Sequence, residues 1–330
     1  MNRKAISLLS RGLDSTLATK LIVEQGIEVV ALHFTSPFCT CSKGNEGCGI
    51  QALRSAGELG VKVIVRPKGM EYLNVVRAPK HGYGKNLNPC IDCRIFILKE
   101  TKKVMDEIEA SFVITGEVLG QRPMSQHRNA MRRIEEESGL EGLILRPLSA
   151  KHFDPTLPEI AGIIDRQKLL DISGRSRKTQ YELVDAFHLK EFSCPGGGCL
   201  LTDPIFARKL KDLFANIPDF TMRDVNLLKI GRHFRFDACT KLIVGRNQDE
   251  NVRLRALHAV PSALLEPSDF KGPTGLLFGN THDAHLNVAA NIMAHYGRKE
   301  TSPVWIDVMN GAKARYCAER RFVDLEKLAI

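Results

Sequence analysis

The fold of this chain is decided by residues 4–26, which read KAISLLSRGLDSTLATKLIVEQG. Residues 4–9 are a short apolar run that predicts a β-strand, and a glycine-containing turn follows them. From Ser15 to Gln25 apolar residues recur at helical spacing, and Gly26 is placed to cap the helix. A strand, a tight turn and a helix in this order predict the first unit of an α/β fold.

The same alternation continues further along the chain. Strands are expected at 27–34, 61–65, 112–115 and 144–148, and helices at 50–59, 91–110 and 158–170. Strands that alternate with helices predict a doubly wound parallel sheet. The Gly-, Pro- and Cys-rich segment 192–204 is interpreted as the end of this domain, which gives an α/β domain at 1–203. Residues 204–330 are expected to form a smaller α+β domain, with strands at 241–244, 275–278 and 304–308 and a helix at 287–295.

Composition narrows the class of protein. The chain has 330 residues, of which 43% are apolar and 26% charged, as in a globular protein of two domains. No apolar run reaches the roughly 18 residues that a membrane span needs, and Met1–Leu9 reads as a first strand and not as a signal peptide. A cytoplasmic protein without a membrane partner is therefore expected. Its net charge of +9 suits a polyanionic partner such as RNA.

The turn after the first strand has the composition of a phosphate-binding loop. It reads Ser10-Arg11-Gly12-Leu13-Asp14-Ser15 and leads directly into a helix. Unpaired backbone N–H groups and the helix dipole both favour a phosphate at such a place. An ordinary Asp/Ser helix cap is the alternative interpretation.

This loop resembles the PP-loop of the ATP-dependent adenylating enzymes, usually Ser-Gly-Gly-x-Asp-Ser. The resemblance implies that Ser10, Arg11, Gly12, Asp14 and Ser15 bind ATP, normally with Mg²⁺. Position 11 departs from the pattern, because it is Arg and not Gly. A positive φ at that position would cost an arginine about 1 kcal/mol or more.

Two cysteine pairs form the second signal. Cys90 and Cys93 lie one turn apart at the start of a predicted helix, where the helix N-terminus favours thiolates. Cys194 and Cys199 flank a glycine-rich loop. Nine cysteines in a reducing compartment favour metal binding or catalysis over disulfides, and zinc held by four thiolates is the simplest interpretation.

The segment from Cys90 to Gln121 resembles the 4-thiouridine synthetase branch of the PP-loop family. Its Cys-Ile-Asp-Cys-Arg and Thr-Gly-Glu-Val-Leu-Gly-Gln strings carry the resemblance. The resemblance implies a 4Fe–4S cluster on Cys90, Cys93 and Cys199, with Cys194 as the other candidate for the third ligand. Persulfide chemistry on paired cysteines, without a cluster, stays open. Residues expected to line the nucleotide site are His33, Phe34, Thr115, Gly116, Glu117 and Gln121.

A third cysteine group, Cys39, Cys41 and Cys48, follows the second predicted strand. Such a loop lies at the carboxyl edge of the sheet, where ligands bind in open α/β folds. These thiols could feed sulfur to the site, hold a metal or be buried, and the sequence does not decide between them.

The C-terminal part resembles the NFACT-R domain, which is associated with RNA-binding proteins. The resemblance rests on residues 234–251 and implies that Arg246, Arg253 and Arg255 contact RNA. Packing or dimerisation is the alternative role for this domain, and a homodimer stays possible. Two further basic stretches, 127–133 and 174–178, lie in the N-terminal part and are either solvated faces or phosphate contacts.

Together these features predict an ATP-dependent tRNA sulfurtransferase. A uridine carbonyl oxygen would be adenylated and then replaced by sulfur, giving a 4-thiouridine or a 2-thiouridine. The sulfur donor, a cysteine desulfurase or sulfide, is not specified by the sequence. The alternatives are a PP-loop enzyme that acts on a small molecule and a non-catalytic RNA-binding protein with structural zinc.

Overall fold

The structure is a computed structural model that describes residues 1–40, 48–192, 199–259 and 261–330. It divides into two compact units, Met1–Asp203 and Pro204–Ile330. Among the described residues, none of the helices has the length and apolarity that crossing a membrane requires.

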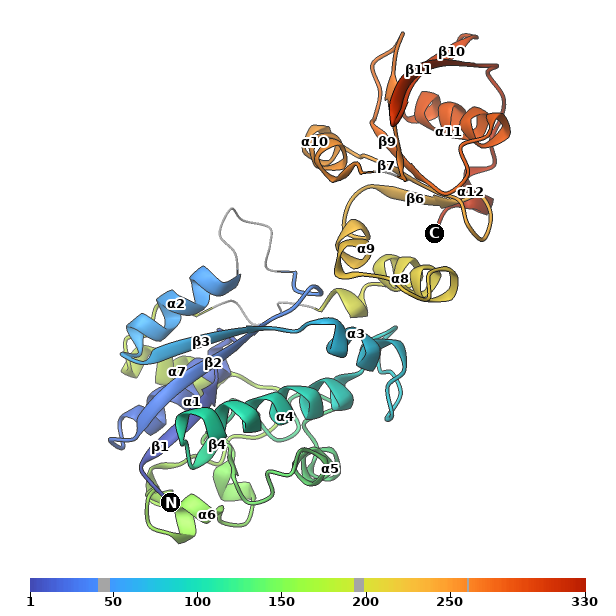
Figure 1. The fold of residues 1–330 in the computed structure, drawn as a ribbon. Helices are drawn as coiled ribbons and strands as arrows, with labels where there is room; N and C mark the ends of the chain where they lie inside the picture. The colour runs from blue at the N-terminus through green and yellow to red at the C-terminus, as the bar shows by residue number, and fades with distance from the viewer. Residues whose placement is uncertain (41–47, 193–198, 260) are drawn as a thin grey trace. The chain divides into compact units, whose positions relative to one another are not determined.

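A five-stranded parallel sheet forms the centre of the N-terminal unit (Figure 1), in the order β3-β2-β1-β4-β5. The strands are β1 Lys4–Leu8, β2 Glu28–Thr35, β3 Lys62–Pro67, β4 Phe112–Ile114 and β5 Ile144–Leu145. The strand order reverses between β1 and β4, and this is where open parallel sheets bind ligands at their carboxyl edge. The predicted doubly wound sheet is confirmed.

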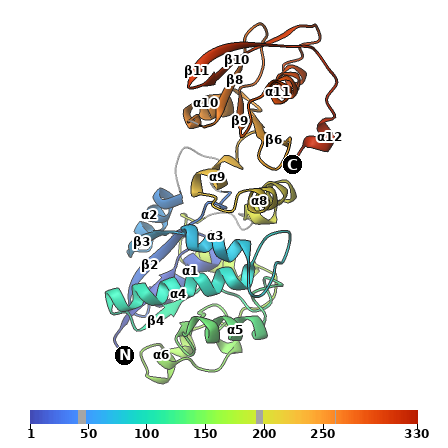
Figure 2. The same cartoon turned by 45° about the vertical axis from the view of Figure 1, so that its right-hand side comes forward.

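Helices cover both faces of this sheet, as Figures 1 and 2 show. One face carries α1 Leu13–Val23, α2 Cys48–Glu58 and α7 Lys178–Ala186, and the other carries α3 Met70–Arg77, α4 Cys90–Ile108 and α5 Arg128–Ser138. Neighbouring residues of β1 alternate between the two cores: Ala5 packs with α1, and Ile6 packs with α4. Burial on both faces explains why β1 reads as a continuous apolar run.

The prediction of one helix at 158–170 is wrong. Helix α6 covers only Leu157–Ile160, and a separate 3₁₀ turn follows at Arg166–Lys168. Gly162 adopts a positive φ of 67°, and the amides of the next two residues both bond to the carbonyl of Pro158. The chain therefore turns back after one helical turn, because glycine in the left-handed region ends a helix.

The C-terminal unit is a six-stranded antiparallel sheet in the order β11-β10-β8-β9-β7-β6. Its strands are β6 Arg232–Arg235, β7 Lys241–Val244, β8 Ala263–Pro267, β9 Gly275–Phe278, β10 Val304–Asn310 and β11 Ala312–Ala318. Its helices are α8 Pro204–Asn216, α9 Met222–Leu227, α10 Gln248–Leu257, α11 Asp283–Tyr296 and α12 Leu325–Leu328. Two apolar clusters, one with residues of α11 and one with Leu254 of α10, give the unit its own core. The α+β prediction is confirmed.

Candidate active site

The predicted phosphate loop joins β1 to α1 and is internally bonded. The hydroxyls of Ser10 and Ser15 lie 3.0 Å apart, and the Ser15 hydroxyl also donates to the carbonyl of Gly12 at 2.9 Å. The segment after β4 lies against this loop: a Cβ on Gly116 would come within 2.4 Å of the Ser15 amide nitrogen. Only glycine fits at position 116, so the loops after β1 and β4 pack directly on one another.

Arg11 adopts the positive φ that is unfavourable for an arginine at this position of the loop. Its φ is 65°, in the left-handed region that favours glycine. Its side chain is buried, and this burial lowers the pKa of Arg11. The neighbouring His33, on β2, bonds through Nδ1 to the carbonyl of Leu9 at 2.8 Å. Burial lowers the pKa of His33, and the charges of Arg11 and Lys68 lower it further, so this imidazole is neutral near pH 7.

Asp14 is held by two amide side chains. Gln121, which follows β4, donates to one carboxylate oxygen at 2.8 Å, and Gln180 of α7 donates to the other at 3.4 Å. Gln121 was expected at this site, whereas Gln180 comes from a helix that the sequence analysis did not predict. Residues from three separate segments therefore fix the orientation of the Asp14 carboxylate.

Glu117 is buried between two arginines. Arg94 of α4 lies 2.7 Å from one carboxylate oxygen, and Arg146, which follows β5, lies 3.1 Å from the other. Burial raises the pKa of Glu117, but the two arginines outweigh it and the net shift is downward. Because both oxygens are engaged in ion pairs, Glu117 joins α4 to the segment after β5 and so orders the loop.

The remaining expected residues of the nucleotide site lie on β2 and β4. Thr115 is buried directly after β4, and its hydroxyl donates to Glu117 at 3.2 Å. Phe34 of β2 is half-buried and packs against the core under α4. Thr115 therefore takes part in the site through Glu117, and Phe34 contributes packing.

Three of the predicted thiols lie in a common environment. Cys90 and Cys93 occupy the first turn of α4, and the sulfur of Cys93 accepts from Lys68 Nζ at 3.3 Å and from the Tyr72 hydroxyl at 3.2 Å. Lys68 Nζ also lies 4.5 Å from the centroid of the Tyr72 ring. Burial raises the pKa of Tyr72, and the nearby sulfurs of Cys93, Cys199 and Cys90 raise it further. A buried ammonium and a buried phenol thus converge on one sulfur atom.

Cys199 reaches this environment from far along the chain. Burial raises the pKa of Cys199 to about 11, and the proximity of Cys93 and Cys90 acts in the same direction. Its segment pairs with the one after β2: the backbones of Cys39 and Cys199 form an isolated antiparallel β-bridge, and the amide of Leu200 donates to the carbonyl of Phe38 at 2.9 Å. The thiol of Cys199 itself is free. Cys39 is disulfide-bonded. Cys39, of the cysteine group that follows the second strand, therefore lies beside Cys199, the residue predicted as the third ligand.

Contacts along the sheet edge connect the thiols to the phosphate loop. Arg94, next to Cys93, bonds to Glu117, and Glu117 adjoins the glycine that packs on Ser15. A second set of contacts makes the same connection. Burial and Cys93 raise the pKa of Cys90, and the charge of Arg122 lowers it, so Arg122 lies near Cys90. Arg122 directly follows Gln121, the glutamine that donates to Asp14. The N-terminus of α4 and the phosphate loop therefore lie at the same edge of the sheet.

The assignment of Cys90, Cys93 and Cys199 as ligands of a cluster stays a prediction. Across residues 1–40, 48–192, 199–259 and 261–330, no three His, Cys, Asp or Glu side chains are arranged to hold a metal ion. The sulfur of Cys93 is instead bonded to Lys68 and Tyr72. Cys41, Cys194 and the side chain of Cys48 lie outside the described residues.

Sequence reasoning missed the partners of the expected residues. They are Lys68, Tyr72, Arg94, Arg146 and Gln180. Two of them carried a usable signal. Lys68 lies three residues after the strand predicted at 61–65, near the carboxyl edge of the sheet, and Arg94 ends the Cys-Ile-Asp-Cys-Arg string. The others act through contacts across the fold, which spacing along the chain does not reveal.

In the C-terminal unit, two of the three expected RNA-contacting arginines are already paired. Arg246 forms an ion pair with Glu250, and Arg255 lies 2.6 Å from Glu266. Arg253 has no ion pair in the part of the chain that the structure describes, and with burial it lowers the pKa of Lys229. Arg253 and Lys229 are therefore neighbouring cations.

Comparisons with known proteins agree with the two-part organisation. Residues 1–156 match the family described as "Thiamine biosynthesis protein (ThiI)", and residues 231–321 match the "NFACT protein RNA binding domain". A "Probable tRNA sulfurtransferase" of Thermococcus kodakarensis is 25% identical over 170 residues, which cover 52% of this chain and 40% of that protein. One of Geobacillus kaustophilus is 32% identical over 147 residues, covering 44% and 34%. The chain thus spans well under half the length of these relatives.

A solved structure described as a "4-thiouridine synthetase - RNA complex with bound ATP" is also similar. It is 21% identical, with a TM-score of 0.37, and the match covers 68% of this chain and 51% of that one. A score at this level does not establish a shared fold. The sequence matches carry the comparison: residues 1–156, in the N-terminal unit, match the ThiI family, and residues 231–321, in the C-terminal unit, match the NFACT RNA-binding domain.

Proposed function

We propose that this protein is an ATP-dependent tRNA sulfurtransferase, which adenylates a uridine carbonyl oxygen and replaces it with sulfur. One observation carries the proposal: Cys93, bonded to Lys68 and Tyr72, lies at the sheet edge that also holds the phosphate loop. The ThiI-family match and the names of the relatives support tRNA as the substrate. The product is a 4-thiouridine or a 2-thiouridine.

The first half-reaction uses the loop from Ser10 to Ser15. Its backbone N–H groups and the N-terminus of α1 bind the pyrophosphate of ATP, normally with Mg²⁺. Asp14, whose carboxylate is oriented by Gln121 and Gln180, would be the residue that holds the Mg²⁺ of the nucleotide, which would supply positive charge to the phosphates. The uridine oxygen attacks the α-phosphorus, the bond to the β-phosphate oxygen breaks, and pyrophosphate leaves. The base then carries AMP, a far better leaving group than an oxide.

The second half-reaction uses the thiols. A sulfur donor, such as a cysteine desulfurase, leaves a persulfide on Cys93. The ammonium of Lys68, 3.3 Å from the sulfur, stabilises the negative charge on the persulfide. Its terminal sulfur attacks the adenylated carbon, the C–O bond breaks and AMP leaves. A second thiol, Cys90 or Cys199, then attacks the Cys93 sulfur and releases the thionucleoside. The resulting disulfide is reduced by an external dithiol.

An iron–sulfur cluster is the alternative sulfur carrier. By donor chemistry its ligands would be Cys90, Cys93 and Cys199, and a bound cluster would supply an open iron that carries sulfide. The hydrogen bonds from Lys68 and Tyr72 to the Cys93 sulfur favour the persulfide as the carrier.

The test is a reaction of the full chain with tRNA, ATP, Mg²⁺, cysteine and a cysteine desulfurase, with thionucleosides read by mass spectrometry. We expect a thionucleoside with the wild type and with Cys239→Ser, an exposed free cysteine of the C-terminal unit. Cys93→Ser is expected to release pyrophosphate but to form no thionucleoside. The absence of any thionucleoside from the wild type, with sulfide also tried as donor, would overturn the proposal.

The colour of anaerobically purified protein separates the two sulfur carriers. A persulfide enzyme is expected to be colourless, whereas a 4Fe–4S cluster absorbs visible light. The persulfide is supported if the peptide that contains Cys93 gains the mass of one sulfur atom only when free cysteine is supplied to the desulfurase. Mass spectrometry of the peptide measures this gain.

A further inference from the structure

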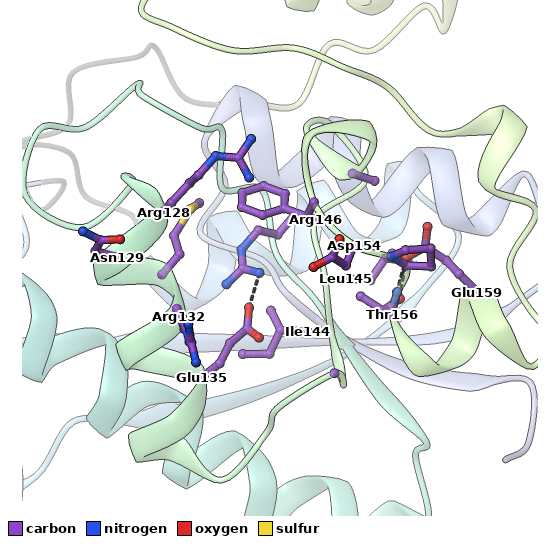
Figure 3. A pocket seen from close by; sticks show the side chains of 15 residues that line it. Arg128, Asn129, Arg132, Glu135, Ile144, Leu145, Arg146, Asp154, Thr156 and Glu159 are labelled. Carbon is purple, nitrogen blue, oxygen red and sulfur yellow. Dashed lines mark hydrogen bonds and ion pairs between the residues drawn. The ribbon is translucent and has the colours of Figure 1, made fainter.

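A pocket of about 420 Å³ lies at the edge strand β5 and shares only Arg146 with the site described above. One wall is the first turns of α5, and the other is the segment 150–159. Figure 3 shows Arg128, Arg132 and Glu135 on the α5 side, and Asp154, Thr156 and Glu159 across from them. Its volume is large enough for one nucleotide and is within the range of small-molecule sites.

Arg146 reaches into this pocket with a hydrogen-bond donor to spare. The side chain is 5% exposed, and it bonds through Nε to Glu117 and through Nη1 to Glu135. Its third nitrogen, Nη2, is buried without a partner among the described residues. A buried guanidinium nitrogen without an acceptor costs free energy, and an anionic oxygen of a ligand would remove that cost.

The charges of the pocket walls leave one cation and one carboxylate unpaired. Glu135 pairs with Arg146, Glu159 with Arg166 and Arg132 with Glu136. Arg128 and Asp154 have no ion pair in the portion of the chain that the structure describes. Arg128 also begins α5, where the helix dipole adds positive potential. The pocket thus offers an anion site and, across from it, an acceptor for a hydroxyl or amino group.

An aromatic ring completes the set. The guanidinium carbons of Arg128 and Arg146 each lie 5.4 Å from the centroid of Phe153. Guanidinium planes and aromatic rings are the surfaces on which unpaired bases stack in RNA-binding proteins. A ligand with a phosphate, a hydroxyl or amino donor and a flat ring would satisfy all of these features together.

We propose that this pocket binds one ribonucleotide unit of the RNA substrate, with its phosphate at Arg128 and Arg146 and a hydroxyl or amino donor at Asp154. The inference rests on the proposed function for the identity of the RNA. The nucleotide held here is outside the reacting site, so the pocket positions the RNA. It takes no part in bond breaking.

The first test compares two arginines of α5 in the full chain. Arg128→Gln and Arg133→Gln remove the same charge, but only Arg128 lines the pocket. Binding of tRNA is measured without ATP over a series of salt concentrations. We expect Arg128→Gln to weaken binding about tenfold and to reduce the salt slope by about 1, and Arg133→Gln to change the affinity less than about twofold. Equal effects of the two variants would overturn the proposal.

Asp154→Asn separates a hydrogen bond to Asp154 from simple charge attraction, because the two predict opposite changes in the affinity for RNA. The variant removes a negative charge, so a purely electrostatic attraction to RNA would make binding tighter. If Asp154 accepts a hydrogen bond from the ribonucleotide, we expect binding to weaken about threefold or more. Tighter binding would overturn the assignment of Asp154. Thermal unfolding of each variant verifies that it is folded.

AMP and CMP serve as free-nucleotide probes, because a free mononucleotide carries the same chemistry as one unit of RNA. Loss of both tRNA and mononucleotide binding in Arg128→Gln supports the proposal. If Arg128→Gln loses mononucleotide binding but binds tRNA normally, the pocket is a nucleotide site, and its assignment to RNA is overturned. Normal binding of both, in a protein whose wild type thiolates tRNA, would overturn the pocket proposal and leave the proposed function standing.

Discussion

Cys93 has the most specific surroundings of the five described free cysteines. Cys239 and Cys317 are exposed, whereas the Cys93 sulfur accepts hydrogen bonds from an ammonium and a phenol. Lys68 is itself buried, so its charge acts on the sulfur with little screening by solvent. This arrangement stabilises negative charge on sulfur at the residue that is proposed to carry it.

Replacing Lys68 by Met removes the ammonium but keeps most of the side-chain volume. We expect alkylation of Cys93 by iodoacetamide at pH 8 to slow about tenfold or more, because the variant lacks the positive charge that lies 3.3 Å from the attacking sulfur. Lys68→Arg keeps the charge and is expected to slow it less. Peptide mass spectrometry measures the rate at Cys93 itself, with Cys239 as an internal control. An unchanged rate in Lys68→Met would refute the role of the ammonium.

The partly buried thiol of Cys199 makes the free energy of unfolding depend on pH in the alkaline range. Its pKa is raised to about 11 from an ordinary value of 9.0. The folded state therefore holds the proton more tightly, and the associated stability is present below pH 9 and lost as the pH rises towards 11. Two pKa units correspond to about 2–3 kcal/mol.

Cys199→Ser has no thiol to ionise at this position. Between pH 9 and pH 11 we expect the free energy of unfolding of the wild type to fall by about 2–3 kcal/mol more than that of Cys199→Ser. Urea unfolding at both pH values measures the difference, and other ionising groups cancel in the comparison. Parallel pH profiles of the two proteins would contradict the assignment.

At the scale of elements, Glu117 joins three parts of the N-terminal unit. It follows β4, and its two arginine partners come from α4 and from the end of β5. These contacts hold the N-terminus of α4, and with it Cys90 and Cys93, against the segment that packs on the phosphate loop. The relative position of the two half-sites therefore depends on one buried carboxylate.

Glu117→Gln leaves two guanidinium groups facing a neutral amide. We expect the free energy of unfolding to fall by about 3 kcal/mol or more, because breaking a buried ion pair leaves charge uncompensated. Glu28→Gln is the matched control, since the Lys4–Glu28 pair is at the surface with Glu28 66% exposed. That change is expected to cost less than about 1 kcal/mol. Chemical denaturation of both variants measures the two costs, and equal values would disprove the role of Glu117.

The elements themselves were largely predictable, and the failures have a physical cause. The strands at β1, β2 and β3 are apolar runs bounded by turns, and periodicity predicts them. The sequence of helix α5 indicates only a basic stretch, because its polar face dominates while Ile134 and a few neighbours supply the buried side. The helix at 158–170 was overpredicted, because local apolar spacing does not show that Gly162 takes a left-handed conformation.

At the scale of the whole molecule, each unit has its own core, and each carries a candidate RNA contact. In the C-terminal unit this contact is Arg253 with Lys229, because Arg246 and Arg255 already pair with glutamates. An unpaired cation is available to a phosphate without breaking an existing ion pair. This favours Arg253 over its two neighbours as an RNA contact.

Arg253→Gln and Arg255→Gln change the same charge on the same helix, α10. In the full chain we expect Arg253→Gln to weaken tRNA binding several-fold and to reduce the dependence of log affinity on log salt by about 1. Arg255→Gln is expected to have a smaller effect, because Arg255 pairs with Glu266 at 2.6 Å. Filter binding at several salt concentrations measures both. A larger effect of Arg255→Gln would reverse the assignment.

Sequence patterns alone predict the parallel sheet, and they single out the loop from Ser10 to Ser15 and the paired cysteines Cys90 and Cys93. These features are contiguous, so their chemistry and spacing are written in a few neighbouring residues. Tertiary structure alone decided the surroundings of those residues: Lys68 and Tyr72 at the Cys93 sulfur, and the arginines of Glu117. It also decided that Cys39 lies beside Cys199. Such partners are separated along the chain by helices and strands, and they meet because parallel strands place their carboxyl ends at one edge of the sheet.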